Sequence, residues 1–432
     1  MRTLLRVCAA ALLISSALLA QNSSLNGTVI DPSGAVIPSA LLTLSNEQTG
    51  IQRVAKSDAQ GRYAFDSLTP GSYRLAAKAA GFADTVLNKI EILVNQPATL
   101  SVKFEKVGTA TETISVEAGS TQINTVDATL GNAIESHQIV ELPSYARNVA
   151  ALLTFQPGVN QSGNVNGGKS DQGNITLDGA DVNNQNSRSA MSSVLNVTID
   201  SVQEFRVTTT NGNADEGRTS GAQITLVTKS GTNQLHGSLY EYRRGTETAA
   251  NSFFNNLSGL PRPALLINIF GGSAGGPIKK NKIFFFINYE GRRDASANSA
   301  LRSVPSPLFS QGIVQYKNTA GAVTTLTPTQ IAAIDGAHIG VDPAVLAMFK
   351  LYPAGNDFTQ GDGLNIIGYR FNSPAHNVQN TYITRFDWAI DDAGKHTVFF
   401  RGQLQNYWNN GSPQFPGQDP SSVGLDNSKG IA

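Results

Sequence analysis

The sequence has 432 residues, which is too long for one ordinary domain and predicts two or three folded units. Only 15% of the residues are charged, the formal net charge is zero and no basic face is apparent, so nucleic acid is excluded as an expected partner. The 41 Gly and 18 Pro, set among recurring apolar runs, favour a mainly β, loop-rich protein over a disordered one.

Residues 1–20 have the features of a secretory signal peptide. Arg2 and Arg6 give a positive start, an apolar run over 7–17 follows, and Ala20 is a small residue suited to the position before cleavage. An uncleaved anchor is the alternative, but the apolar run is short for a helix that crosses a bilayer. We therefore expect export of the chain.

The single cysteine, Cys8, lies inside this leader. Residues 21–432 consequently have no thiol, which excludes disulfides, cysteine nucleophiles and cysteine-ligated metals in the mature chain. No other stretch of the sequence is long and apolar enough for a transmembrane helix, so any insertion into a membrane would have to use β-strands.

Residues 24–106 contain short strand candidates separated by turn signals such as Asp31-Pro32-Ser33-Gly34. Seven strands at such spacing in about 80 residues predict an immunoglobulin-like or prealbumin-like β-sandwich. The candidates are 25–30, 40–46, 52–57, 61–66, 71–79, 85–93 and 98–106.

The same segment resembles the carboxypeptidase regulatory-like domain of bacterial surface proteins. The matching stretches are GTVIDPSGAVIPSA (27–40), DAQGRYAF (58–65), LTPGSYRL (68–75) and AGF (80–82). The resemblance implies a non-catalytic sandwich of the carbohydrate-binding-like fold, and the segment has no histidine and no cluster of metal ligands. Sugar binding does not follow from this analogy alone.

Residues 107–118 form a linker that includes the extended-looking octet TETISVEA (111–118). The octet resembles a TonB box, the segment that TonB-dependent receptors offer to a periplasmic energising protein. Contact would occur by β-augmentation, in which an unpaired strand adds to a sheet edge. A last sandwich strand or a plain linker is the alternative, since an apolar–polar octet is a weak pattern. The residues implied in the contact are Thr113, Ile114, Ser115 and Val116.

Residues 119–232 are rich in Gly, Asn, Ser and Thr, with short strands and a short helix within 145–155 expected. They resemble the plug domain of TonB-dependent transporters of the Oar-like group, with departures at Glu216, Gln223 and Thr225 that leave local packing open. The matching stretches are LPSYARN (142–148), LLTFQPGV (152–159), NITLDGADVNN (174–184), VQEFRV (202–207), ADEGRTSGA (214–222) and VTKSGTNQLHGS (227–238).

Three arginines of this plug-like segment are candidates for holding it inside a barrel. Arg147, Arg206 and Arg218 could pair with acids on the inner barrel wall, which would hold a plug and still let it be displaced. Solvation at the surface is an equal alternative.

Residues 233–432 are expected to begin a transmembrane β-barrel. Aromatic and aliphatic residues alternate with polar ones in 381–390 and in 396–408, and a short turn joins the two segments into a hairpin of about ten-residue strands. Tyr382, Thr384, Phe386, Trp388 and Ile390 share one face of the first segment. A soluble sandwich could show the same alternation, but strand length and terminal aromatics favour a membrane strand.

Further barrel strands are expected at 235–244 and 282–293, and FGGSAGGPI (270–278) with 282–293 resembles the first barrel hairpin. The polar stretch 294–375 is expected to be an extracellular loop. Because too few strands are present to close a barrel, and an open edge cannot face lipid, we expect the sequence to be truncated.

Two patterns with catalytic or metal-binding precedents are assigned to turns. Gly271 to Gly275 matches G-x-S-x-G, but Gly276-Pro277 follows where a nucleophile elbow needs a helix, so a tight barrel turn is favoured. Asp178, Asp181, Asn183 and Asn184 suggest calcium, but an Asp-Gly turn is favoured because the calcium-loop pattern is incomplete. The 5 His show no metal-ligand spacing, so no catalytic, cofactor or metal site is expected.

The resemblance implies a receptor in the outer membrane for energy-coupled uptake of an unidentified nutrient, such as a carbohydrate or another bulky ligand. Its implied partners are a TonB-type periplasmic energising protein, outer-membrane lipid and the extracellular ligand, with the sandwich and plug on the periplasmic and lumen side. No enzyme activity is expected. The alternative is a secreted or cell-surface adhesion or scaffold protein, which would continue as further β-sandwiches instead of alternating strands.

Overall fold

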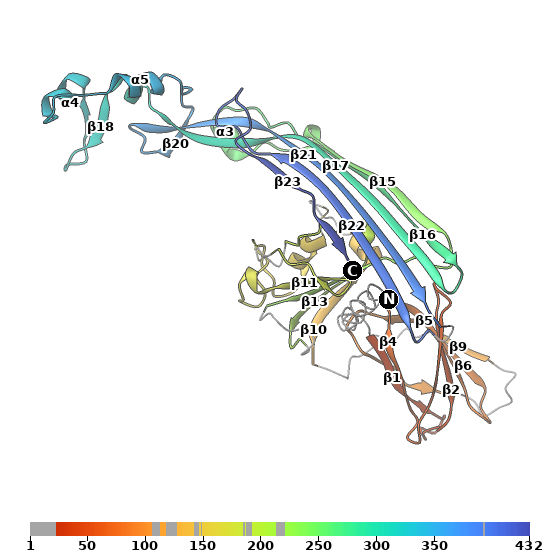
Figure 1. Cartoon of the computed structure of the whole chain (residues 1–432). Coiled ribbons are helices and arrows are strands. Elements are labelled where there is room, and N and C mark those ends of the chain that lie inside the picture. Colours follow the sequence, from red (N-terminus) through yellow and green to blue (C-terminus); the bar gives the residue numbers. More distant parts are fainter. Residues whose placement is uncertain are drawn as a thin grey trace, which may run out of the picture.

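The computed structural model describes residues 23–105, 113–117, 128–141, 147, 149–184, 186, 192–212, 221–391 and 394–432. The strands form three bodies, namely a front sandwich, a central domain and a curved wall of long strands (Figure 1). The predicted signal peptide and Arg218 lie outside the described residues. Within these ranges no helix has the length and apolarity needed to cross a lipid bilayer.

The front sandwich consists of two sheets. One sheet has the order β4-β1-β7 with β8 also on β1, and the other has the order β3-β2-β5-β6-β9. The strands are β1 (Ser23–Ile30), β2 (Leu41–Asn46), β3 (Gln52–Lys56), β4 (Arg62–Leu68), β5 (Gly71–Lys78), β6 (Asp84–Ile92), β7 (Ala98–Thr99), β8 (Val102–Lys103) and β9 (Thr113–Glu117). The strand predicted at 98–106 is thus split into two short pieces.

Alternation of side chains along these strands builds the sandwich core. In β4, Tyr63 and Phe65 are buried while Arg62 and Asp66 are exposed, because successive side chains of a strand point to opposite faces. Facing residues of both sheets complete one cluster, which includes Leu25, Val29, Leu42, Leu44, Leu75, Ile90, Ile92 and Phe104.

The segment that resembles a TonB box is paired in this structure. Its strand β9 lies parallel to β6, from Asp84 opposite Thr113 to Asn88 opposite Glu117. Among the described strands β9 is the last of its sheet, so only one of its two edges has a partner. A contact between Thr113–Val116 and an energising protein stays a prediction.

The central domain contains a five-stranded sheet of order β10-β13-β14-β11-β12. Every residue of β14 is buried, and its polar Gln223 accepts a hydrogen bond from Asn174 at 3.0 Å, which accommodates this departure from the family pattern. The elements are β10 (Leu130–Glu135), α2 (Ser136–Glu141), η2 (Val149–Phe155), η3 (Ser170–Gln172), β11 (Asn174–Leu177), β12 (Ala180–Asp181), η4 (Ile199–Ser201), β13 (Val202–Thr210) and β14 (Gln223–Thr228).

The wall is an antiparallel sheet of long strands that curves past the central domain (Figure 1). Its path is β15-β16-β17-β21-β22-β23, with β20 on β21 and β24 on β22, and β15 does not pair with the far edge within the described residues. The sheet is therefore an open wall. Its strands are β15 (His236–Gly245), β16 (Leu266–Lys279), β17 (Ile283–Pro305), β20 (Asp357–Gly361), β21 (Ile366–Ala389), β22 (Thr397–Asn410), β23 (Val423–Asp426) and β24 (Lys429–Ile431).

The wall strands are longer than their sequence pattern predicts. The prediction of a loop over 294–375 is wrong at both ends, since β17 continues to Pro305 and pairs with β21 as far as Ile366. Backbone hydrogen bonds carry this ladder, so polar side chains such as Asn298 and Ser299 do not end it. At about 3.4 Å per residue, the 23 residues of β17 span roughly 75 Å, which is longer than a membrane requires.

The outer halves of β17 and β21 form an arm that leaves the wall (Figure 1). Its connection contains β18 (Val314–Lys317), β19 (Val323–Leu326), α4 (Pro328–Ile334) and α5 (Pro343–Phe349). A chain of aromatic contacts, with ring centroids 5.1–6.5 Å apart, joins Phe309, Phe349, Tyr352, Phe415 and Tyr369. These rings give the arm a small core of its own.

The expected tight turn at Gly271–Gly275 is also wrong. These residues lie within the continuous strand β16 and pair with β15 and β17 on both sides. The turn of this hairpin comes later, at Lys280-Asn281. A strand interior cannot provide the strand-to-helix elbow that a serine nucleophile needs.

The two faces of the wall have opposite polarity. Phe386, Trp388 and Leu404 point away from the central domain and are 41–54% exposed, whereas Arg401 and Gln403 point toward it and are buried. The alternation predicted for 381–390 and 396–408 is therefore present, with the apolar face outward. A sheet of a water-soluble domain places its apolar face inward, so this wall is built in the opposite sense.

Replacing Leu44 with Ala is expected to lower the free energy of unfolding of the front sandwich by about 2–5 kcal/mol, because truncation leaves a cavity in a closed core. Val54 lies on the neighbouring strand and is 60% exposed, so Val54→Ala should change it by less than about 0.5 kcal/mol. Hydrogen exchange of β2 and β5 in increasing urea measures both variants. Equal losses would contradict the described packing.

Candidate functional site

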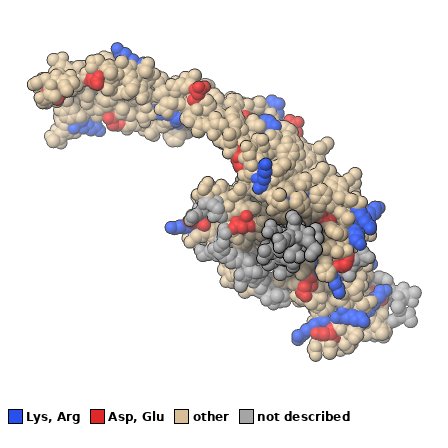
Figure 2. All heavy atoms as spheres, viewed as in Figure 1, with Lys and Arg blue, Asp and Glu red and all other residues tan. Residues whose placement is uncertain are grey.

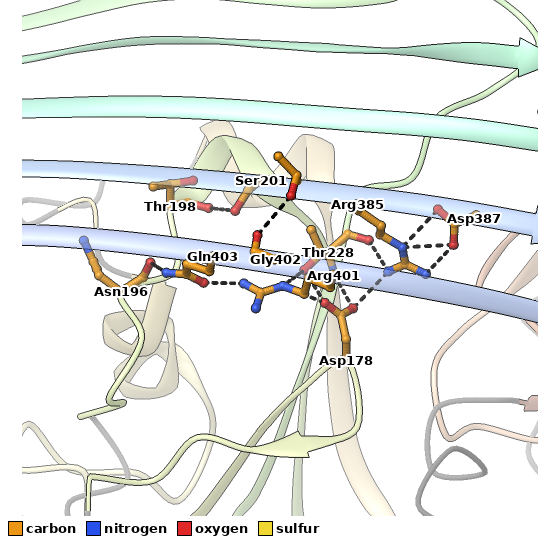
Figure 3. Close-up of polar contacts among 11 residues, drawn as sticks. Asp178, Asn196, Thr198, Ser201, Thr228, Arg385, Asp387, Arg401, Gly402 and Gln403 are labelled. Carbon is orange, nitrogen blue, oxygen red and sulfur yellow. Dashed lines mark hydrogen bonds and ion pairs between the residues drawn. The ribbon is translucent and has the colours of Figure 1, made fainter. Parts of the chain in front are cut away.

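A polar cluster centred on Asp178 joins the central domain to the wall (Figure 3). Asp178 and Gly179 form the two-residue turn between β11 and β12, and both have left-handed backbone angles, with φ of 48° and 83°. Two-residue hairpin turns favour Asp-Gly for this reason. The turn is thus the predicted Asp-Gly turn, and it presents the Asp178 carboxylate to the wall.

Four donor groups surround the Asp178 carboxylate. Thr228, at the end of β14, donates from its backbone N at 2.9 Å and from its hydroxyl. Arg385 of β21 donates from Nη1 at 2.9 Å, and Arg401 of β22 lies with Nε 3.0 Å from Oδ2. An ionised carboxylate has about four acceptor sites, so these donors use them all and leave none for calcium.

The two arginines are neutralised by two aspartates. Arg385 and Arg401 lie opposite each other in the β21–β22 ladder, where like charges repel. Arg385 also holds Asp387 with two nitrogens, Nε at 3.0 Å and Nη2 at 2.9 Å from Oδ1. With Asp178 and Asp387 both ionised, the four charges sum to zero, and the buried cluster is electrostatically balanced.

The cluster also ties down the chain that leaves β14 for the wall. Arg385 donates to the carbonyl of Thr228 at 2.9 Å, and Ser230 donates to Asp387 at 2.7 Å. A cavity of about 190 Å³ adjoins these groups, lined in part by Thr228, Ser230, Arg385 and Asp387. Water has room and polar partners in such a cavity, so these bonds can exchange for bonds to water.

A second group of hydrogen bonds holds the segment before η4 against the wall. Gln403 donates to the carbonyl of Asn196 and Gln405 accepts from its backbone N, each at 2.7 Å. Thr198 donates to Asn288 of β17 at 2.8 Å. These bonds and the Asp178 cluster tie the central domain to wall strands β17, β21 and β22, and all of them are polar.

Arg147 contacts both the central domain and the wall. Its Nη2 lies 2.6 Å from Asp200, an acid of the central domain, and its guanidinium lies 3.8 Å from the ring centroid of Tyr242 on β15. The contact with the wall is thus a cation–π contact with an aromatic ring. The charge of Arg147 also acts on the carboxylate of Glu290 on β17, so the pairing of Arg147 with a wall acid stays a prediction.

Arg206 faces the front sandwich instead of the wall. It lies on β13 and donates from Nη1 to the side chain of Gln96 at 2.6 Å. The pairing of Arg206 with a wall acid therefore stays a prediction, and Arg218 lies outside the described residues. At the Asp178 cluster the wall supplies two arginines and the central domain supplies an acid, which is the reverse of the predicted arrangement.

The residues that sequence reasoning missed are Asp178, Arg385 and Arg401. The polar face of the predicted hairpin does place Arg385 and Arg401 at facing positions with one acid, Asp387, beside them, so two cations with a single neighbouring acid were a signal. The acid comes from a turn 207 residues away in sequence, and no local pattern connects the two.

Glu204 is a second buried acid of the central domain. Both oxygens of its carboxylate accept from the backbone N of Val94 in the front sandwich, at 2.9 and 3.0 Å. Burial raises the pKa of Glu204 to about 7, Glu135 and Glu91 add to the rise, and the Val94 N–H and Arg206 oppose it. Protonated Glu204 is therefore favoured where the sandwich and the central domain meet.

Comparison with known proteins assigns two parts of the chain to families. Residues 24–105 match the carboxypeptidase regulatory-like domain and residues 227–430 match the outer membrane beta barrel domain. The TonB-dependent transporter Oar of Myxococcus xanthus is 29% identical over 303 residues. Residues 227–430 of this chain therefore form an outer-membrane β-barrel segment, and the chain is similar in sequence to a TonB-dependent transporter.

The similarity to Oar covers 66% of this chain and 28% of Oar, so the chain spans less than a third of that relative. Among solved structures, the outer membrane transporter YddB from Escherichia coli has a TM-score of 0.41 at 14% identity, over 66% of this chain and 34% of YddB. The siderophore receptor PirA from Pseudomonas aeruginosa has a TM-score of 0.33 at 15% identity, over 65% and 41% of the two chains.

The outer-membrane location explains the polarity of the wall. Its apolar face points outward to lipid, and its polar face points inward to the central domain. Figure 2 shows mostly uncharged residues along the wall and the arm, and basic residues at the lower end of the wall.

Replacing Asp178 with Asn is expected to destabilise the contact between the central domain and the wall by about 3–5 kcal/mol, since Arg385 and Arg401 would lose a buried counter-charge. Hydrogen exchange of β14 in increasing urea measures the loss. Asp171→Asn, an exposed change in the same domain, is the matched control and should have no measurable effect.

Stability is expected to fall as pH rises through the range where Glu204 titrates. Its ordinary pKa is 4.5 and its pKa in the folded chain is about 7, so the folded form binds the extra proton. The stabilisation is complete below about pH 4.5 and is lost as pH rises through about 7. Melting temperatures at about pH 5 and pH 8 should differ for the wild type and much less for Glu204→Gln. An equal shift in both proteins would contradict the assignment to Glu204.

Proposed function

We propose that the protein takes up a nutrient across the outer membrane with energy from a TonB-type periplasmic protein. In this proposal, residues 1–20 are a signal peptide, 24–106 the sandwich, 107–118 a linker, 119–232 a plug and 233–432 the start of the barrel. The supporting observation is the Asp178 cluster, which holds the central domain to the wall by polar bonds beside a cavity of about 190 Å³.

Such an interface suits a plug that is displaced and then returns. An apolar interface would expose hydrophobic surface to water when it opened. Arg385, Arg401 and Asp178 can instead each be solvated by water in an open lumen. The cost of opening is then the loss of a set of polar bonds. A pull on the chain before the plug could supply that energy.

The pull would act on β9. Its free edge can accept a strand of the energising protein through main-chain bonds, which require only an extended segment. Because β9 precedes the central domain in the chain, tension on residues 113–117 would pass toward β10.

We propose that the arm captures the ligand, since it lies beyond the membrane-spanning part of β17 and β21. The nature of this ligand, a carbohydrate or another bulky nutrient, stays a prediction. Binding and displacement need no covalent chemistry, so the proposal includes no enzyme activity and no cofactor. The alternative hypothesis of an adhesion protein predicts further β-sandwiches after the first one. The wall strands and the match to the barrel domain lie in that part of the chain instead.

Replacing Ile114 with Pro is expected to abolish uptake, because proline lacks the N–H that strand addition uses. The measurement is metabolite profiling of the growth medium, which looks for a solute depleted by cells with the wild type and not by cells with the variant. Ile114→Val keeps a strand-forming residue and is the matched control. Equal depletion by wild type and Ile114→Pro would contradict energy coupling through β9.

An arginine on the outward face should destabilise the wall according to its depth in lipid. Leu404 pairs with Tyr382 across β21 and β22, at a level of the wall that we place in the lipid interior. Leu404→Arg should therefore cost about 2–4 kcal/mol of stability. Asn406→Arg lies one outward position nearer the arm and should cost about 0–1 kcal/mol. Urea unfolding in lipid vesicles measures both, and equal costs would contradict the proposed membrane depth.

A further inference from the structure

The front sandwich touches the central domain through the turn between β6 and β7. Val94, in this turn, is fully buried and donates its N–H to both oxygens of Glu204 on β13. Two residues further on, Gln96 accepts from Arg206 of the same strand at 2.6 Å. A buried backbone donor without its acceptor is costly, so this contact resists separation.

The sandwich also touches the wall, through the turn between β2 and β3. Asn233, just before β15, donates from its side chain to the carbonyl of Thr49 at 2.6 Å and from its backbone to Gln48 at 3.0 Å. The same side chain accepts from the backbone N of Asn281, in the β16–β17 turn, at 2.8 Å. Asn233 thus joins the sandwich to the end of a wall hairpin.

A second wall hairpin meets the same sandwich turn. A Cβ placed on Gly394, between β21 and β22, would lie 2.4 Å from the Ile51 side chain, so this glycine allows the close approach. Figure 1 shows the sandwich beneath the lower ends of the wall strands. Its two turns are therefore in contact with two different bodies at once.

The three bodies meet around the cavity that adjoins the Asp178 cluster. The sandwich contributes Asn46 and Thr69 to its lining, the central domain contributes Gln203, and the wall contributes Trp388 and Phe399. The sandwich thus forms part of the lining of the cavity beside the Asp178 cluster.

We propose that the front sandwich is a clamp: it holds the central domain and the wall together from the periplasmic side and must detach before the central domain can leave the wall. The physical basis is bivalent binding, in which one domain makes two separate contacts. While the sandwich is bound to the wall, it keeps the central domain close to the wall, and the reverse also holds. The central domain and the wall therefore separate rarely as long as both contacts of the sandwich are made. The proposal uses the plug movement proposed above only to say which motion the clamp opposes.

Glu204→Ala is the variant that opens the clamp, since it removes the acceptor of the Val94 N–H and leaves the Asp178 cluster intact. Hydrogen exchange of the whole protein in lipid vesicles, without ligand or energising protein, is read in two places. Exchange should rise about tenfold in the β6–β7 turn, as expected when a buried N–H is left without its acceptor. The rise should extend to β14 and the Asp178 turn.

Asp171→Ala is the matched control. Asp171 is an exposed acid in η3 of the same domain and is not among the charges that shift the pKa of Glu204. This variant should leave exchange at both places unchanged. A rise at the β6–β7 turn with unchanged β14 would overturn the clamp, because the sandwich would then dock without holding the central domain. No rise at either place would overturn the docking itself.

A cross-link tests whether strengthening the contact between the sandwich and the wall has the opposite effect. It does not depend on the folding of Glu204→Ala. Thr49→Cys and Asn281→Cys place thiols at two positions that Asn233 bridges, in a chain whose single cysteine, Cys8, lies in the leader. Bridging them with a short bismaleimide should slow exchange of β14 severalfold relative to the unbridged double variant. Unchanged exchange would overturn the clamp. Because neither experiment uses uptake, a failure of energy coupling would leave both results interpretable.

Discussion

The position of the central domain depends on one buried carboxylate, Asp178, shared by two arginines that face each other on the wall. Arg385 and Arg401 would repel each other without it, and Asp178 would be a buried charge without them. Each side of the interface therefore requires the other. This mutual requirement fixes the place of the central domain, yet every bond in it can be exchanged for water.

The polarity of the wall follows from the same requirement. Its inward face carries the groups that bind the central domain, so its apolar residues must face outward, and lipid is the environment in which an outward apolar face is stable. The front sandwich contributes residues to the lining of the cavity beside the inward-facing cluster. Glu204 and Asn233 connect it to the two bodies that Asp178 joins.

Local patterns were reliable wherever a feature repeats along the chain. The alternation in 381–390 identifies the two faces of β21, and the turn signals of residues 24–106 locate β1 to β6 within one or two residues. The same patterns underestimated β17 and β21, because a ladder held by backbone bonds continues through Asn298 and Ser299 without an apolar signal. They also placed a turn at Gly271–Gly275, where glycine in fact lies within a strand.

By itself, the sequence determined the order of the bodies, the mainly β class and the family, since turn residues, period-two alternation and ordered motifs are local properties of the chain. Only the tertiary structure decided which charges meet. Arg206 was a candidate for the wall and faces Gln96, while Asp178 was a candidate calcium ligand and binds Arg385 and Arg401. The reason is physical: an ion pair depends on the distance between two side chains in space, and residues 207 positions apart share no periodicity that reports it.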